Sequence, residues 1–167
     1  MRVKKKLVII MLFCLCAALA ACVQSGERND TPALAHEYSS ITADADGNVV
    51  IPLENITTVA SFYNYDADGV TVQLLAIRDP GGKAHISYNT CKSCSPSPKA
   101  YFVQRGEVLI CENCGNAFTS EQVGLSSSGC FPWPIEGAVI GEDSITVPVV
   151  SLDAMRDSFA SWKGPTE

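Results

Sequence analysis

The feature that most constrains this chain is the stretch from residue 91 to residue 130, which holds five of its eight cysteines. Cys91 pairs with Cys94 and Cys111 with Cys114 at the spacing CxxC, and Cys130 follows alone. Sixteen residues separate the two pairs, a gap within the range expected of a four-cysteine zinc site. Four thiolates also suit a single iron or an iron–sulfur cluster, so the spacing predicts a metal site without choosing the metal.

Short strands are expected to bring the two pairs together. Residues 100–103 and 108–110 predict a hairpin with Gly106 at its turn, and each CxxC pair follows a strand. Gly115 favours a left-handed turn after the second pair. The pattern therefore predicts a ribbon-like site with two knuckles, and we expect an apolar shell around it from Tyr101, Phe102, Phe118 and Trp133.

Disulfides and thiol exchange are the alternatives to a metal. Cysteines of exported domains are usually oxidised to disulfides. Five cysteines cannot all pair with one another, and a disulfide within CxxC closes so small a loop that it adds little stability. Cys130 is open to three interpretations: a metal ligand, a resolving thiol or an inert buried residue.

The first residues predict export. Arg2 and three lysines precede an apolar run over residues 7–19, as in a signal peptide. Leu19-Ala20-Ala21-Cys22 resembles the lipobox of bacterial lipoprotein signals, which implies cleavage before Cys22 and lipidation of its thiol. We therefore expect residues 1–21, with Cys14 and Cys16, to be removed, and an extracytoplasmic protein to be lipid-anchored to the bacterial cell membrane.

Charge excludes one class of partner. Residues 1–21 hold four of the 12 Lys and Arg and none of the 18 Asp and Glu, which leaves eight bases and a net charge of −10 on the remaining 146 residues. A chain this acidic lacks the excess of positive charge that binds the phosphates of nucleic acid. Residues 22–46 are polar and predict a flexible tether, with a weakly amphipathic helix over 32–38 as the alternative; residues 47–167 predict one domain.

Alternation and turn signals predict the fold of that domain. Strands are expected near residues 49–53, 60–65, 70–78 and 84–88, with turns at Asp66–Gly69 and Asp79–Gly82. The short connections favour an antiparallel sheet. Residues 144–150 predict an edge strand because of Pro148, and residues 154–162 a short helix with Met155, Phe159 and Trp162 on one face. The expected fold class is mainly β (β-rich α+β).

No catalytic residues are predicted. The chain has no phosphate-binding glycine loop, no Ser-His-Asp set and no paired acid and base carboxylates, so an accessory role is favoured over hydrolase or transferase activity. Neither His36 nor His85 has a second histidine at ligand spacing, so both are expected to be ordinary strand or surface residues.

Four motifs resemble those of a known family: NTCKSC at 89–94, AYFVQRG at 100–106, CENCGNAF at 111–118 and GCFP at 129–132. Together, over roughly residues 48–160, they resemble the FtrD-like membrane iron-sulfur protein family. Where that family has Gly-Gly-Cys-Asn-Pro, this chain has Ser128-Gly129-Cys130-Phe131-Pro132. The resemblance implies that iron or an iron–sulfur cluster binds to Cys91, Cys94, Cys111, Cys114 and Cys130.

Three functions follow as hypotheses. The resemblance favours an iron-binding lipoprotein that passes electrons or metal to a membrane transport system, with ABC-type permeases, iron permeases and thioredoxin-like envelope proteins as associates. The spacing alone favours a structural zinc ribbon in a lipoprotein that docks on a permease. The third hypothesis is a thiol–disulfide exchange protein, in which the two CxxC pairs cycle between the dithiol and the disulfide form.

Overall fold

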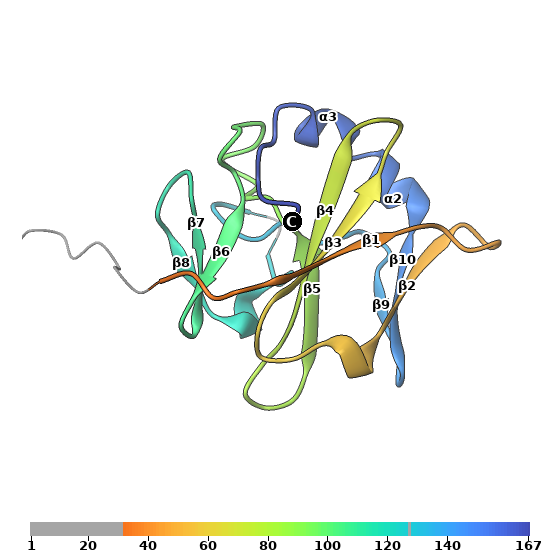
Figure 1. Cartoon of the computed structure of the whole chain (residues 1–167), viewed down its shortest axis with the longest axis horizontal. Helices are drawn as coiled ribbons and strands as arrows, with labels where there is room; N and C mark the ends of the chain where they lie inside the picture. Colours follow the sequence, from red (N-terminus) through yellow and green to blue (C-terminus); the bar gives the residue numbers. More distant parts are fainter. Residues whose placement is uncertain (1–31, 127) are drawn as a thin grey trace, which may run out of the picture. The chain divides into compact units, whose positions relative to one another are not determined.

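A four-stranded sheet forms the middle of the computed structural model, which describes residues 32–126 and 128–167 (Figure 1). Its strand order is β1 (Glu37–Ile41), β3 (Ser61–Asp66), β4 (Thr71–Arg78), β5 (Ala84–Tyr88). The predicted signal peptide, Cys22 and the first part of the predicted tether lie outside the described residues. All described residues fall in one compact unit, Thr31–Glu167.

The predicted turns connect the antiparallel strands of this sheet. Between β3 and β4, Asp68 and Gly69 have φ of 56° and 85°, and the Asp66 carboxylate accepts a hydrogen bond from the Gly69 amide. Between β4 and β5, the Asp79 carboxylate accepts one from the Lys83 amide, and Gly82 has φ of 88°. Left-handed positions in tight turns suit Gly and Asp, which explains why these sequences reverse the chain.

Strand β4 is buried on both faces, and this divides the fold into two cores. Val72, Leu74 and Ala76 belong to one apolar cluster, here called the first core, and Leu75 and Ile77 belong to another, the second core. Since side chains alternate along a strand, the two clusters lie on opposite faces of the sheet.

A second sheet packs on the face of the central sheet that carries the first core. β10 (Ser144–Pro148) lies between β2 (Asn48–Pro52) and the short β9 (Val139–Ile140), antiparallel to both. The prediction of an edge strand at residues 144–150 is therefore wrong. Pro148 is tolerated because it is the last residue of β10, and β9 pairs only with Ile145 and Thr146. A 3₁₀ turn, η1 (Leu53–Asn55), follows β2.

Two short helices cover the same core. They are α2 (Val149–Asp153) and α3 (Arg156–Phe159). The predicted single helix over 154–162 is wrong in its bounds, because the chain turns again at Met155 and Trp162 lies beyond α3. The three residues expected on one face are nevertheless buried in the first core: Met155, Phe159 and Trp162.

The second face carries the predicted ribbon. β6 (Phe102–Arg105) and β7 (Val108–Cys111) form an antiparallel hairpin, and Gly106 has φ of 61° at its turn, as expected. β8 (Ala117–Phe118) extends it, followed by the 3₁₀ turn η2 (Ser120–Gln122). Phe102, Leu109 and Phe118 pack with Leu75 and Ile77 of β4 in the second core. The fold is thus mainly β with antiparallel sheets, as predicted, and two short helices take the place of the single helix expected.

Strand β1 is a correction to the predicted tether. Residues 37–41 lie parallel to β3, and Tyr38 stacks on Phe62 with ring centroids 5.3 Å apart. The flexible tether over 22–46 is therefore wrong for these residues, as is the alternative helix over 32–38. Parallel pairing needs a long connection between the two strands, and β2 and η1, which lie between β1 and β3 in the chain, provide it.

Candidate metal centre

The first knuckle begins where β5 ends. The Cys91 amide donates to the Ala100 carbonyl at 3.0 Å, and the amides of Cys94 and Ser95 donate back to the Cys91 carbonyl at 3.0 and 2.9 Å. These bonds close a tight turn around the pair. Cys91 is fully buried and Cys94 is partly buried, so one sulfur lies in the core and the other faces its edge.

The second knuckle follows β7. The Cys111 amide donates to the Asn116 carbonyl, and the Gly115 amide donates to the Cys111 carbonyl at 2.8 Å. Gly115 has φ of 75°, the left-handed conformation expected from the sequence. The two cysteines of this pair also differ in burial: Cys111 is fully buried, whereas Cys114 is exposed.

A third segment brings Cys130 to the first knuckle. Residues 131–133 run antiparallel to residues 90–92, with a bridge between Cys91 and Pro132. The Lys92 amide donates to the Phe131 carbonyl at 3.2 Å, and the Trp133 amide donates to the Thr90 carbonyl at 3.1 Å. This backbone ladder fixes the loop that carries Cys130.

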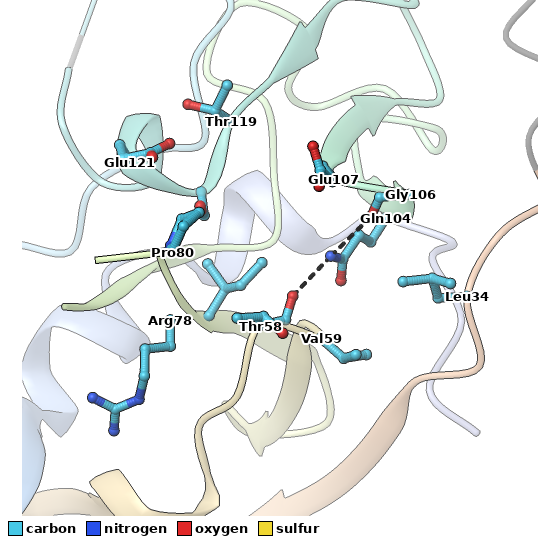
Figure 2. A pocket seen from close by; sticks show the side chains of 12 residues that line it. Leu34, Thr58, Val59, Arg78, Pro80, Gln104, Gly106, Glu107, Thr119 and Glu121 are labelled. Carbon is cyan, nitrogen blue, oxygen red and sulfur yellow. Dashed lines mark hydrogen bonds between the residues drawn. The ribbon is translucent and has the colours of Figure 1, made fainter. Parts of the chain in front are cut away.

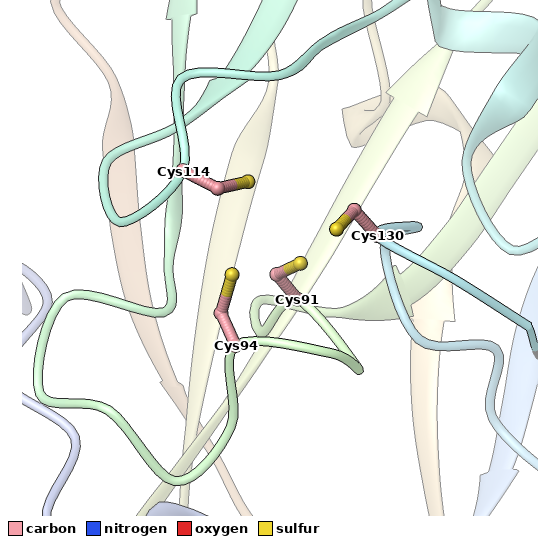
Figure 3. Close-up of side chains that lie close together, drawn as sticks. All are labelled: Cys91, Cys94, Cys114 and Cys130. Carbon is pink, nitrogen blue, oxygen red and sulfur yellow. The ribbon is translucent and has the colours of Figure 1, made fainter.

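Three segments thus bring four sulfurs together. In Figure 3 the side chains of Cys91, Cys94, Cys114 and Cys130 point toward one another, and their Sγ atoms all lie within 4.8 Å of one another. Cys111 lies beside this set, with its Sγ 3.9 Å from that of Cys94. The structure therefore gathers all five predicted ligand residues in one place, but the mutual set of four uses Cys130 in place of Cys111. Metal binding by these residues remains a prediction.

Aromatic side chains close part of the site. Phe102, Phe118 and Phe131 share the second core with the cysteines, and the ring centroids of Phe118 and Phe131 are 5.2 Å apart. Of the predicted shell, Phe102 and Phe118 are placed as expected. Tyr101 and Trp133 are not, because both pack against the first core. Phe131, where the resembled family has asparagine, supplies apolar cover instead.

The buried thiols influence one another's protonation. The Cys91 thiol hydrogen-bonds to the Cys111 sulfur, and this bond, with burial second, raises the pKa of Cys91 far above that of a free thiol. The same bond, opposed by burial and aided by the amides of Cys114 and Asn113, lowers the pKa of Cys111 to about 5. Mutual repulsion keeps several thiolates from coexisting here, so a cation that replaces the thiol protons is needed to deprotonate the whole set.

A buried amide network positions the first knuckle, and the sequence interpretation missed it. The Asn89 side chain donates to the Gln73 side chain at 2.6 Å and accepts from the Phe102 amide at 2.8 Å, while the Trp162 indole donates to the Asn89 carbonyl. Asn89 and Gln73 are fully buried. The available signal was Gln73 itself, since a glutamine inside an otherwise apolar strand indicates a buried hydrogen-bond partner.

The loop between Cys94 and Ala100 ties the knuckles to the rest of the fold. The Ser97 hydroxyl donates to the Asn113 side chain of the second knuckle at 2.6 Å. The Ser95 hydroxyl donates to the carbonyl of Ser158 in α3, and the Lys163 amide donates to the Pro98 carbonyl. The two knuckles are thereby held against each other and against the C-terminal segment.

The two histidines lie in hydrogen bonds of their own. His36 Nδ1 is 3.1 Å from the Ala60 carbonyl, and His85 Nε2 is 2.9 Å from a carboxylate oxygen of Asp79. Within the described residues, the candidate metal set contains cysteines alone.

A separate pocket of 440 Å³ opens between the sheet and the ribbon (Figure 2). No cysteine lines it. The Gln104 side chain donates to the Thr58 carbonyl across it, and the Arg78 guanidinium is bonded to the carbonyls of Leu53, Ile56 and Gly82. Gln104 and Arg78 are thus committed to the protein backbone, and the other charged side chains that line the pocket are Glu107 and Glu121.

Comparison with known proteins identifies the family. Over the part of the chain that the structure describes, no helix is long and apolar enough to cross a membrane. Residues 56–159, which include all five clustered cysteines, match the family described as membrane iron-sulfur containing protein FtrD-like. No curated protein and no solved structure matches the chain. The match spans more than half of the sequence, and the chain therefore belongs to the FtrD-like family of membrane iron-sulfur containing proteins.

Proposed function

We propose that this protein is a lipid-anchored iron protein of the bacterial envelope that passes electrons or iron to a membrane transport system. The observation that carries the proposal is the cluster of four cysteine sulfurs within 4.8 Å of one another. Membership of an iron-sulfur containing family of membrane proteins supports iron as the metal and the membrane as the location.

The donor set fits iron. Sulfur is a soft ligand that selects zinc, copper(I) and iron–sulfur chemistry over calcium or magnesium, and thiolate-bound iron supplies one-electron redox chemistry. Cys91 is buried against Phe102 and Phe118, so this side of the site excludes water. Cys114 is exposed, so the opposite side is the route by which electrons or metal reach a partner.

Cys22 is the proposed anchor. Its place at the end of a lipobox-like signal supports lipidation there, and two or more acyl chains hold a protein stably on a bilayer. The proposed partners are an ABC-type or iron permease and a thioredoxin-like envelope protein, because members of the family that the motifs resemble are associated with such proteins.

Zinc is the second candidate, and the same geometry favours it. A closed set of four cysteines is also the usual structural zinc site. Zinc in this place would make the cysteines a scaffold and would leave a docking lipoprotein without a redox role.

Thiol–disulfide exchange is less well supported. An exchanging cysteine needs an accessible thiolate. Cys111 has the lowered pKa in the cluster, but its side chain is fully buried. Cys114 is an exposed residue, but partial desolvation of its thiol, with hydrogen bonds to Cys111 and Cys94, raises its pKa to about 12.

Metal analysis of the full chain tests these candidates. The protein would be purified in detergent without oxygen, and its iron, zinc and visible spectrum would be measured before and after reduction. Iron with absorbance that bleaches on reduction is the expected result, lost in Cys91→Ser and kept in the matched control Ser93→Ala, an exposed residue of the same knuckle. Stoichiometric zinc without colour would overturn the redox role, and a metal-free protein whose thiol count changes with reductant would favour exchange.

A further inference from the structure

The spacing of the sulfurs limits how many metal ions the cluster can hold. One ion with four thiolates at about 2.3 Å in a tetrahedron sets neighbouring sulfurs about 3.8 Å apart. The Sγ atoms of the four-cysteine set all lie within 4.8 Å of one another, close to that separation. A small inward shift of side chains brings them onto a single ion.

An iron–sulfur cluster needs a wider site. Each thiolate of a four-iron cluster bonds a different iron, and in a two-iron cluster the thiolates divide between the irons. In both, irons and inorganic sulfide occupy the space between the protein sulfurs, so some thiolate pairs must lie much further apart than on one ion. A set with every separation within 4.8 Å leaves no such space.

Hydrogen bonds, most of them between backbone groups, hold the sulfurs at this spacing. Cys91 and Cys94 are tied by the turn that their backbones close, and Cys91 and Cys130 by the ladder between residues 90–92 and 131–133. Cys114 is held through the bond between Ser97 and Asn113. To admit a cluster, these three segments would have to separate and break bonds that are buried in part.

Cys111 differs from the other four. It is fully buried at the end of β7 and lies outside the mutual set, although its sulfur is hydrogen-bonded to those of Cys91 and Cys114 and lies 3.9 Å from that of Cys94. Cys130, whose loop departs from the family motif, lies inside the set.

We infer that the protein holds one tetrahedral metal ion on Cys91, Cys94, Cys114 and Cys130, with Cys111 as a neighbouring thiol that is not a ligand. The inference deepens the proposed function and rests on it for the identity of the metal. It replaces the ribbon arrangement, in which both cysteines of each knuckle bind, with a site completed by the third segment.

Reconstitution of the full chain tests the number of ions. The metal-free protein in detergent would be given ferrous iron alone or ferrous iron with sulfide, without oxygen, and then analysed for iron, acid-labile sulfide and Mössbauer spectrum. One iron per chain without sulfide, with the spectrum of an isolated ion, is expected in both samples. Iron that binds only when sulfide is supplied, in comparable amounts, would overturn the inference and leave an iron-handling function intact.

Cobalt(II) tests the choice of ligands. Its absorption bands report a tetrahedral site with four thiolates, and the matched pair Cys111→Ala and Cys130→Ala would be titrated with Co²⁺ beside the unaltered chain. We expect Cys111→Ala to keep the four-thiolate bands and Cys130→Ala to lose them. The opposite pattern would overturn the assignment.

Two controls separate the possible failures. Far-UV circular dichroism checks that each variant is folded, and Cys111→Ser, which keeps a polar group of similar size, replaces Cys111→Ala if the latter is unfolded. A chain that binds one Zn²⁺ or Co²⁺ but no iron would overturn the proposed iron function while supporting a single-ion site.

Discussion

The buried amide network makes Asn89→Ala the most informative substitution for the fold around the site. Asn89 is fully buried, and its side chain satisfies the Gln73 side-chain oxygen and the Phe102 amide. Truncation leaves both groups buried without that partner. An unsatisfied buried group costs about 1–3 kcal/mol, so the two predict a loss of about 2–6 kcal/mol in the free energy of unfolding. That is a large part of the 5–15 kcal/mol typical of a domain.

Asn113→Ala is the matched control for this substitution. Asn113 is exposed and accepts one hydrogen bond, from Ser97, so its loss is expected to cost under about 1 kcal/mol. Urea unfolding of the full chain in chelator, followed by the fluorescence of Trp133 and Trp162, measures both without a contribution from metal. A difference between the two variants below about 0.5 kcal/mol would refute the reasoning that the network holds the first knuckle to the sheet.

Three further perturbations address the anchor, the site and the backbone. Cys22→Ser is expected to abolish labelling of the protein by radioactive palmitate in cells, while Cys16→Ser keeps it; labelling of Cys22→Ser would contradict the anchor. Metal affinity is expected to fall as pH falls, with roughly four protons released per ion at pH 7, because the four ligand thiols must all become thiolates and an ordinary thiol is protonated at that pH. Titration in buffers of different ionisation enthalpy counts the protons, and release of none would contradict thiolate ligation. Gly124→Ala is expected to lower the Tm of the protein more than Gly69→Ala. Both glycines have positive φ, but only at Gly124 would a Cβ collide with a backbone carbonyl, that of Ile86. Equal shifts in Tm would refute the collision.

Local patterns predicted the elements whose neighbours are close in sequence. The hairpins β3–β4 and β6–β7 depend on short turns with Gly69 and Gly106 in left-handed conformations. Such turns specify both the reversal and the pairing of the strands they join. The sequence was therefore sufficient for the antiparallel sheet and the ribbon.

Elements that pair with distant partners were predicted less well. β1, Glu37-Tyr38-Ser39-Ser40-Ile41, is mostly polar, and its strand conformation comes from pairing with β3, twenty-four residues further along the chain. The position of β10 depends on β2, almost a hundred residues earlier. Neither partner leaves a mark in the local pattern, so the sequence alone predicts a tether at β1 and an edge strand at β10.

The same distinction applies to the candidate site. Spacing identified the two knuckles and all five cysteines, because a CxxC turn is a local feature. It could not rank Cys111 against Cys130. Cys111 comes at the end of a buried strand, which draws its side chain into the core, whereas Cys130 reaches the cluster through a ladder with residues that lie forty positions earlier.

The division into two cores explains how such a site can be kept ready for metal. The first core, on the opposite face of β4, contains no cysteine and includes Leu74, Ile145 and Phe159, all of them buried. It does not depend on metal for its packing, unlike a zinc finger, whose folding free energy comes from the ion. The segment after Cys130 is bonded through Trp133 to the backbone of Tyr88 and Thr90, and the chain before the first knuckle is bonded through the Asn89 amide to the Gln73 carbonyl of β4. Because that sheet orders the sulfurs beforehand, we expect little reorganisation to accompany a change in the charge of a bound ion, which is the property that the proposed electron transfer would require.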